Sequence, residues 1–224
     1  MTRAFDTAQM WMPKPLNTDL AGAFARLSAP RAGAFAIVPR MMASKRAFNA
    51  INARDRARRR AMVKPENCRD ILTSLPTEPG DTLHAAVPGN FIFGSLITAI
   101  AQQRHTQVMH LATLSLSKRN ADDLAALVTE GAVGRIVMLL STYFEKTNTA
   151  IFEHLKHRAA EVGSITIATA RTHAKVALFD FGDGHLSIET SANLRSSDNS
   201  EQLSAFADPT LYTFHRQWLD EFFT

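Results

Sequence analysis

The stretch THAKVALFDFGDGHLSIETSANLRSSDNSEQ, residues 172–202, decides the fold. Its centre is Gly182-Asp183-Gly184, in which both glycines tolerate the positive φ angles of a tight hairpin turn. The flanking residues are typical of strands. The sequence therefore predicts strands over residues 172–181 and 185–190 that pair as an antiparallel hairpin.

This hairpin is expected to gather four polar side chains at its open end. Residues two apart on a strand point to the same face, so His173 and Lys175 project together. With the turn centred on Asp183, His173 pairs with Asn193, and Lys175 pairs with Ser191. An imidazole, an ammonium, an amide and a hydroxyl are therefore expected close together.

Such a set of groups suits attack on a phosphodiester. A neutral imidazole, here that of His173, can attack phosphorus and give a phosphohistidine that water then hydrolyses. The non-bridging oxygens gain charge on the way, and Lys175 and Asn193 can supply fixed donors to them. Glu201 can hold one ring nitrogen of a histidine so that the other nitrogen faces the substrate. No step requires a metal ion or another cofactor, so we expect none.

The same residues resemble the phospholipase D superfamily. His173-Ala-Lys175, followed after four residues by Asp180, matches the H-x-K-x4-D motif of that family. The segment that follows resembles the second sequence element of the family, through Ser191-Ala-Asn193, Arg195-Ser196, Asn199 and Glu201. Residues 81–220 as a whole are similar to phospholipase D-like proteins of bacteriophages and prophages, through segments such as FIFGSLITAI and LATLSLSKRNADDLAAL.

The resemblance implies roles for four of these residues. It makes His173 the nucleophile or its paired acid. It makes Lys175 and Asn193 the groups that hold the phosphate, and Glu201 the carboxylate that orients the histidine. Asp180 belongs to the motif, but strand alternation places it on the face opposite His173, so we interpret it as structural.

Two features depart from the family pattern. Thr190 stands where the family usually has a glycine before the serine, and the interval from Asp180 to Ser191 is longer than usual. We expect the tip of the hairpin to absorb this insertion.

A family active site uses two such motifs, because one histidine attacks while the other protonates the leaving oxygen. The full motif occurs once in this chain. The resemblance therefore implies a two-fold homodimer that shares its active site across the axis.

From residue 81 onward, predicted strands and helices alternate. This alternation implies a mainly parallel sheet covered on both faces, to which the hairpin adds an antiparallel element. The expected fold class is α/β, with a mixed, mainly parallel sheet between helical layers, as in phospholipase D. The predicted strands before the hairpin are 82–87, 107–116, 135–141 and 164–170, and the predicted helices are 94–104, one with Asn120 as N-cap, 148–162 and 210–223.

Residues 1–80 are expected to form a basic, helical arm that precedes a catalytic domain at residues 81–224. Residues 1–70 carry a net charge of +9, whereas the remainder carries −5. A short helix is predicted over residues 67–75, and a longer one over residues 44–63, in which seven of twenty residues are Lys or Arg. Its cations can track a nucleic-acid backbone, although contact with a partner protein is an alternative. These candidate nucleic-acid-binding residues are Lys45, Arg46, Arg54, Arg56, Arg58, Arg59 and Arg60.

Composition points to a cytoplasmic protein. The single cysteine, Cys68, rules out an internal disulfide and fits a reducing compartment. The beginning of the sequence lacks an apolar signal region. The longest apolar stretch, residues 91–101, has eleven residues, whereas roughly 20 are needed to cross a bilayer. We therefore expect no membrane span.

Together these features predict a metal-independent phosphodiesterase, with nucleic acid as the substrate of an endonuclease. Two alternatives stay open. One is a phospholipid hydrolase or phosphatidyl transferase, and the other is a non-catalytic, nucleic-acid-binding phage module.

Overall fold

The structure is a computed structural model that describes residues 48–52, 59–63, 69–87, 91–196 and 198–223. The first two of these segments are described by their backbone alone. All described residues belong to the second of the two units into which the chain divides, Ala43–Thr224.

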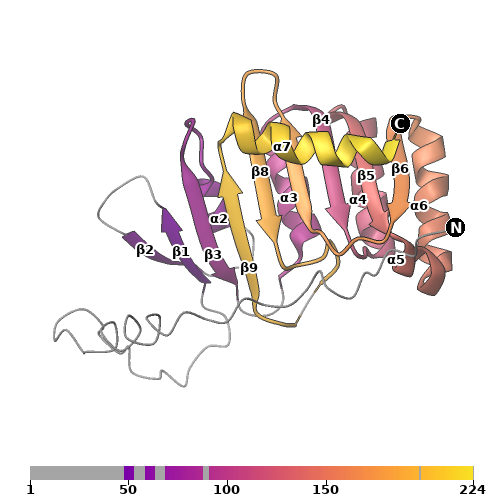
Figure 1. Ribbon diagram of the computed structural model, residues 1–224, viewed down its shortest axis with the longest axis horizontal. Helices are drawn as coiled ribbons and strands as arrows, with labels where there is room; N and C mark the ends of the chain where they lie inside the picture. The colour runs from indigo at the N-terminus through magenta and orange to yellow at the C-terminus, as the bar shows by residue number, and fades with distance from the viewer. Residues whose placement is uncertain (1–47, 53–58, 64–68, 88–90, 197, 224) are drawn as a thin grey trace, which may run out of the picture. The chain divides into compact units, whose positions relative to one another are not determined.

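The described residues form one nine-stranded sheet (Figure 1). The strand order is β2-β1-β3-β9-β8-β7-β4-β5-β6. The strands are β1 (Phe48–Asn52), β2 (Arg59–Val63), β3 (Thr82–Val87), β4 (Thr106–Thr113), β5 (Val133–Ser141), β6 (Ile165–Ala170), β7 (Val176–Asp180), β8 (His185–Thr190) and β9 (Glu201–Phe206).

The sheet is mixed, as predicted, but the expectation that it is mainly parallel is wrong. Only β4–β5 and β5–β6 are parallel, and the other six pairings of the described strands are antiparallel. Parallel neighbours need a long crossover, usually a helix. Such helices connect β4 to β5 and β5 to β6, whereas β7, β8 and β9 follow one another without a helix and therefore pair antiparallel.

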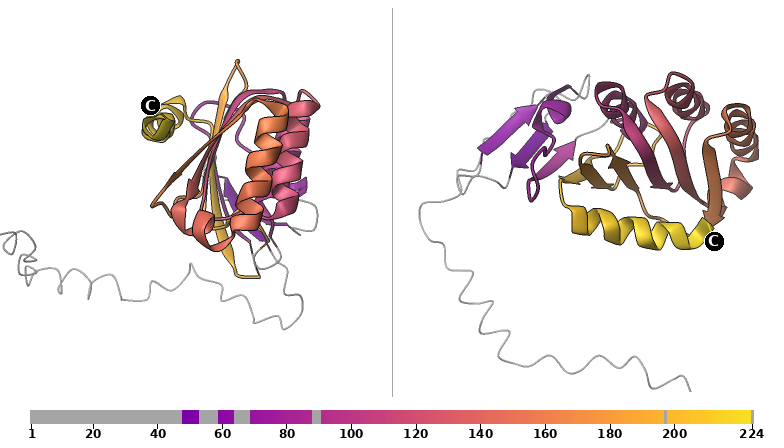
Figure 2. Two further views of the ribbon diagram at one scale, coloured as in Figure 1. Left: turned by 90° about the vertical axis from the view of Figure 1, so that its right-hand side faces the viewer. Right: turned by 90° about the horizontal axis from the view of Figure 1, so that it is seen from above.

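Helices cover both faces of the sheet, which confirms the predicted helical layers. Figure 2 shows α4 (Lys118–Thr129) and α6 (Thr149–Val162) on one face and α7 (Pro209–Asp220) on the other. Helix α3 (Phe93–Gln103) packs beside α4. The short elements are α2 (Arg69–Ser74), α5 (Thr142–Thr147) directly after β5, and the 3-10 turn η3 (Glu221–Phe223) after α7.

A hydrophobic core fills each of the two interfaces. The larger core contains Phe93, Leu124 and Leu155 from the helices on the first face. The smaller core joins Leu178 of β7 to residues of α7, including Leu219. Strand β7 is thus buried on both faces, as expected for a central strand with a continuous apolar run. Each fully buried side chain of this kind contributes about 1.5–3 kcal/mol.

Helix α4 begins at Lys118, and its N-cap is Ser117 rather than the predicted Asn120. The Ser117 hydroxyl accepts a hydrogen bond from Asn120 N at 3.2 Å, and Ser117 N donates to Asn120 Oδ1 at 3.0 Å. Asn120 therefore completes a reciprocal capping box from the third helical position, which satisfies two backbone donors at once.

The predicted helix over residues 44–63 is wrong where it is described. Residues 48–52 and 59–63 are the strands β1 and β2, and β1 pairs antiparallel with β3. Helix propensity is a weak prior that pairing with a sheet edge overrides. The boundary at residue 80 stays a prediction. Among the proposed nucleic-acid-binding residues, Arg59 and Arg60 lie in β2, and the others are outside the described residues: Lys45, Arg46, Arg54, Arg56 and Arg58.

The other predicted helices, and the predicted strands before the hairpin, agree with the structure. Strand β3 has the predicted bounds, 82–87, and α2, α3, α6 and α7 lie within a few residues of theirs. Within the described segments, no helix combines the length and the apolar character that a bilayer crossing requires.

Candidate active site

The β7–β8 hairpin exists, but its register differs by one residue from the prediction. Its paired ends are Asp180 and His185, so Gly182 and Asp183 are the two central turn residues. Phe181 N donates to Gly184 O at 3.0 Å. Of the two glycines of this hairpin, only Gly182 has a positive φ, +84°. This is the position at which a two-residue hairpin turn favours glycine.

The predicted cross-strand pairs of His173 with Asn193 and of Lys175 with Ser191 are therefore wrong. Strand β7 begins only at Val176, after His173 and Lys175, and β8 ends before Ser191 and Asn193. The four residues lie on irregular segments beyond the two strand ends. One backbone bond extends the hairpin there, from Thr190 N to Lys175 O at 3.1 Å.

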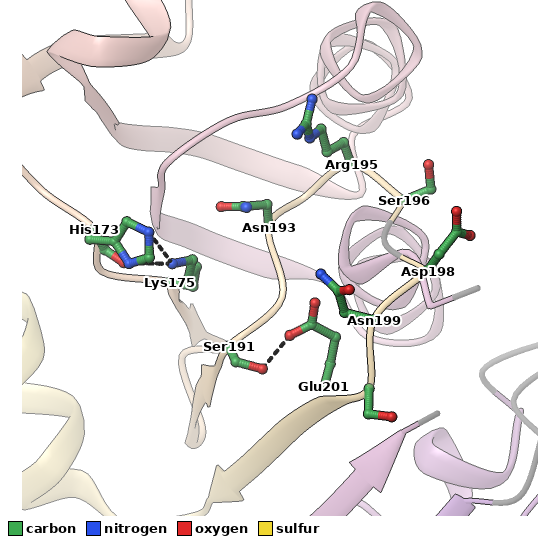
Figure 3. A pocket seen from close by; sticks show the side chains of 10 residues that line it. His173, Lys175, Ser191, Asn193, Arg195, Ser196, Asp198, Asn199 and Glu201 are labelled. Carbon is green, nitrogen blue, oxygen red and sulfur yellow. Dashed lines mark hydrogen bonds between the residues drawn. The ribbon is translucent and has the colours of Figure 1, made fainter. Parts of the chain in front are cut away.

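These irregular segments nevertheless bring the predicted residues together in one open pocket of about 570 Å³ (Figure 3). Figure 3 shows the side chains of His173, Lys175 and Asn193 turned toward the same space. All lining side chains are polar or charged: His173, Lys175, Ser191, Asn193, Arg195, Ser196, Asp198, Asn199, Ser200 and Glu201. The motif residue Asp180 is not among them. It lies at the hairpin turn, where its Oδ1 accepts from Gly182 N at 2.9 Å.

Lys175 is buried beneath an exposed His173. Its ammonium donates to His173 Nδ1 at 2.7 Å and to the His173 carbonyl oxygen at 2.9 Å. Burial lowers the pKa of Lys175, and the Glu201 carboxylate opposes this shift. A charge with few solvent contacts gains more from an arriving anion than an exposed one does, because the low dielectric strengthens the attraction.

Glu201 is the first residue of β9, and it is buried. Its carboxylate accepts a hydrogen bond from the Ser191 hydroxyl. The same hydroxyl accepts from Gln202 N at 3.0 Å, and Ser191 N donates to Gln202 O at 3.1 Å. Glu201 therefore contacts Ser191, while the ring of His173 is bonded to Lys175. The role of Glu201 in orienting a histidine stays a prediction.

Asn193 is held between two anchored neighbours. Ala192 and Leu194 are fully buried on either side of it. Leu194 N donates to Thr113 Oγ1 at 3.4 Å, and Gly94 N donates to Leu194 O at 3.0 Å. The Oδ1 atom of Asn193 is buried and has no hydrogen-bond partner among the described residues. The amide is thus fixed at the pocket, and its Oδ1 atom can still accept a hydrogen bond.

Thr190, which precedes Ser191, joins two strands through its side chain. Its hydroxyl donates to Gln202 O at 2.6 Å and accepts from Ala192 N at 3.1 Å. These bonds tie the end of β8 to β9 and fix the start of the segment that carries Ser191 and Asn193. A glycine cannot make either bond.

Sequence reasoning missed the contributions of Gly94 and Thr113. A Cβ atom at Gly94 would lie 2.9 Å from Leu194 O and 2.4 Å from Asn120 Nδ2. Thr113, at the end of β4, is completely buried below the same segment. Both residues are far from the motif in sequence, and no local pattern marks them.

A second H-x-K spacing, His154-Leu-Lys156, lies on helix α6. Residues two apart on a helix do not face each other. His154 Nε2 is 2.8 Å from Asp122 Oδ1, whereas Lys156 Nζ donates to Glu153 at 3.1 Å. These two side chains therefore form separate surface pairs and do not converge on one site.

No protein-family model matches the chain, and no curated protein matches it. Among solved structures, it is similar to the polyphosphate kinase from Porphyromonas gingivalis, with 14% identity and a TM-score of 0.45 over 58% of this chain and 23% of that one. It is also similar to the phosphatidylserine synthase of Haemophilus influenzae Rd KW20, with 14% identity and a TM-score of 0.49 over 75% of this chain and 42% of that one. The chain thus spans less than half the length of either neighbour.

Proposed function

We propose that the chain is a phosphodiesterase of the phospholipase D type that cleaves nucleic acid as an endonuclease without a metal ion. The observation that supports this most is the convergence of His173, Lys175, Asn193 and Glu201 on one pocket. These residues come from the segment before β7, the loop after β8 and the first residue of β9. They supply a nucleophile, a cation, an amide and a carboxylate, which a phosphoryl-transfer site can use.

In the first step, a phosphate group enters the pocket and draws the Lys175 ammonium away from His173. The freed lone pair of the imidazole attacks phosphorus, and the bond from phosphorus to the leaving oxygen breaks. Lys175 and the Asn193 amide donate to the non-bridging oxygens as their charge grows. The product is a phosphohistidine that retains one ester bond.

The leaving oxygen needs a proton, and we assign it to His173 of a second copy of the chain. In the second step, water attacks phosphorus as the nitrogen–phosphorus bond breaks, and one proton of the water reprotonates the histidine of the second copy. A homodimer of this kind supplies both imidazoles from one motif.

The polar pocket supports a nucleic acid rather than a phospholipid as substrate. No apolar side chain lines it within the described residues, so an acyl chain would find little apolar surface there. The net charge of +9 on residues 1–70 favours a polyanion over a single headgroup.

The test is cleavage of plasmid and single-stranded DNA in excess EDTA, comparing the wild type with His173→Ala. We expect cutting by the wild type that survives EDTA and disappears in the variant. Cutting that persists in the variant would exclude the histidine mechanism. If neither protein cuts DNA but the wild type hydrolyses phosphatidylcholine vesicles, the substrate is lipid. Sedimentation of the wild type as a strict monomer would contradict the shared site.

A further inference from the structure

Several exposed side chains lie along the sheet edge that carries the pocket. Strands β5 and β6 run parallel and end together at the pair Ser141–Ala170. Tyr143 follows the end of β5 by two residues, and Arg171 directly follows β6, two residues before His173. In Figure 1 the connection from β6 to β7 and the helix α5 lie at this same edge. The nucleophile, the tyrosine and the arginine are therefore neighbours by topology.

Tyr143 presents its ring to solvent from a fixed backbone. The residue is 64% exposed, whereas its neighbour Phe144 is buried and anchors α5 in the core. Tyr143 N donates to Ser141 Oγ at 3.2 Å, and Thr147 Oγ1 donates to Tyr143 O at 2.8 Å. The other described aromatic rings with comparable exposure, Phe214 and Phe222, belong to α7 and η3. Among the described residues, Tyr143 is thus the exposed aromatic ring at the end of the sheet where the pocket lies.

Exposed cations lie at the same end of the sheet. Arg171 is exposed, as are Lys118 at the start of α4 and Arg195 at the pocket rim. None of the three forms an ion pair with another described residue, whereas Arg119 pairs with Asp123 at 3.8 Å. Lys118 begins the helix that follows β4, so it belongs to the same edge as Arg171. A cationic path with an exposed aromatic ring is the chemistry that binds single-stranded nucleic acid.

We infer that this edge is a binding strip for the single strand that flanks the scissile phosphate. The strip consists of Lys118, Tyr143, Arg171 and Arg195. Tyr143 stacks on an unpaired base, and Arg171 contacts a backbone phosphate next to the one that His173 attacks. Strand β5 is two strands away from β7, a separation of about 10 Å across the sheet. One bound strand can therefore reach both. The inference rests on the proposed function of the pocket and adds a preference for unpaired over duplex substrate.

The test measures binding separately from cleavage. In a His173→Ala background, which prevents cutting, the affinity for a short fluorescein-labelled oligo(dT) is measured by anisotropy. Tyr143→Ala should weaken binding by about 5-fold or more, because stacking on one aromatic ring is worth roughly 1–3 kcal/mol per base. Tyr143→Phe, which keeps the ring, should bind within about 2-fold of the parent. Phe214→Ala is the matched control, since it removes an exposed ring from α7, and it should leave the affinity unchanged.

Two further measurements sharpen the outcome. Arg171→Ala should reduce the slope of log affinity against log salt by about 0.7, the value for one phosphate contact with a single strand. A duplex of the same length should lose less affinity than oligo(dT) when Tyr143 is replaced, because its bases are already stacked. Unchanged oligo(dT) binding by both Tyr143→Ala and Arg171→Ala would overturn the strip, as would a parent protein that does not bind oligo(dT).

The two proposals fail in different ways. If the wild type cuts DNA in EDTA but neither Tyr143→Ala nor Arg171→Ala alters binding, the proposed function stands and the strip is wrong. If Tyr143→Ala weakens binding although the wild type cuts nothing, the edge binds nucleic acid and the proposed chemistry is wrong.

Discussion

The Lys175 ammonium lies 2.7 Å from Nδ1 of His173, so the cation that we propose for binding phosphate occupies a lone pair of the proposed nucleophile. In the proposed mechanism, this contact keeps the lone pair from attacking until an anion enters the pocket. The ammonium then has a stronger partner, because a charge-assisted bond to a phosphate oxygen exceeds a bond to a neutral imidazole. In the proposed mechanism, release of the nucleophile is in this way coupled to substrate binding.

We expect the buried Lys175 to lower the stability of the fold while serving the proposed reaction. Burial lowers the pKa of its ammonium, so the charged form is disfavoured in the folded state. We expect Lys175→Met to raise the free energy of unfolding at neutral pH by roughly 0.5–2 kcal/mol while abolishing phosphodiester cleavage. Chemical denaturation and the EDTA cleavage assay measure the two effects.

The sign of the pH dependence follows from the same shift. Between the lowered pKa and the ordinary value, the unfolded chain binds more protons than the folded one, so the stability of the wild type rises with pH. The gain in unfolding free energy of Lys175→Met over the wild type should therefore shrink as the solution becomes alkaline. If this gain is constant across the range, the buried charge of Lys175 is not its cause.

His110 should make the protein sensitive to mild acid. It is buried in β4 under α7, where burial lowers its pKa and the Asp220 carboxylate, 3.2 Å away, opposes the shift. As the pH falls through the unfolded value, the unfolded state binds more protons and stability decreases. Thermal unfolding between about pH 5 and pH 8 should show this decrease in the wild type.

His110→Leu is the variant that isolates this group. The Nδ1 atom of His110 has no hydrogen-bond partner among the described side chains, so an apolar replacement removes a buried unsatisfied atom. The variant should lose the part of the pH dependence that lies near the ordinary histidine pKa. An identical pH profile for both proteins would assign the acid sensitivity to other groups.

Gly94 should be intolerant of a side chain because of what it supports. A Cβ atom there would meet the backbone oxygen of Leu194 at 2.9 Å, next to Asn193. Gly94→Ala should therefore destabilise the fold by about 1–3 kcal/mol and displace the Asn193 segment. Thermal unfolding measures the first effect, and cleavage per folded molecule measures the second. Gly184→Ala is the control, since its Cβ would lie 3.5 Å from the nearest atom, Arg104 Nη2, at a position without positive φ.

Local patterns predicted the elements whose signals lie within a few residues. Strand β3 and the β7–β8 hairpin carry apolar runs bounded by turn residues, and both were found. The turn centre was misplaced because two glycines flank Asp183, and only the structure shows that Gly182 alone adopts a positive φ. That one-residue difference was enough to invalidate the predicted cross-strand pairs.

Elements that depend on distant partners were missed. Strand β9 begins with Glu201 and Gln202, which continue a polar loop in sequence, and its pairing with β3 and β8 cannot be read locally. For the same reason, the sequence predicts a helix where the structure has strands β1 and β2. The pocket residues were identified because the motif concentrates them in residues 173–201, whereas their supports Gly94 and Thr113 come from other parts of the chain.

The bond between Ser191 and Glu201 leads to a decisive mutational cycle. If Glu201 acts only through Ser191, then Ser191→Ala, Glu201→Gln and the double variant should lower kcat to the same degree, because each breaks one unit. If Glu201 instead orients an imidazole in the assembled dimer, Glu201→Gln should cost far more than Ser191→Ala, and the two losses should add. We expect the second result, since a carboxylate that holds a catalytic histidine stabilises its charged form, which Ser191 cannot do. Single-turnover cleavage of a labelled oligonucleotide separates the cases. Equal losses in all three variants would restrict Glu201 to fixing the loop that carries Asn193.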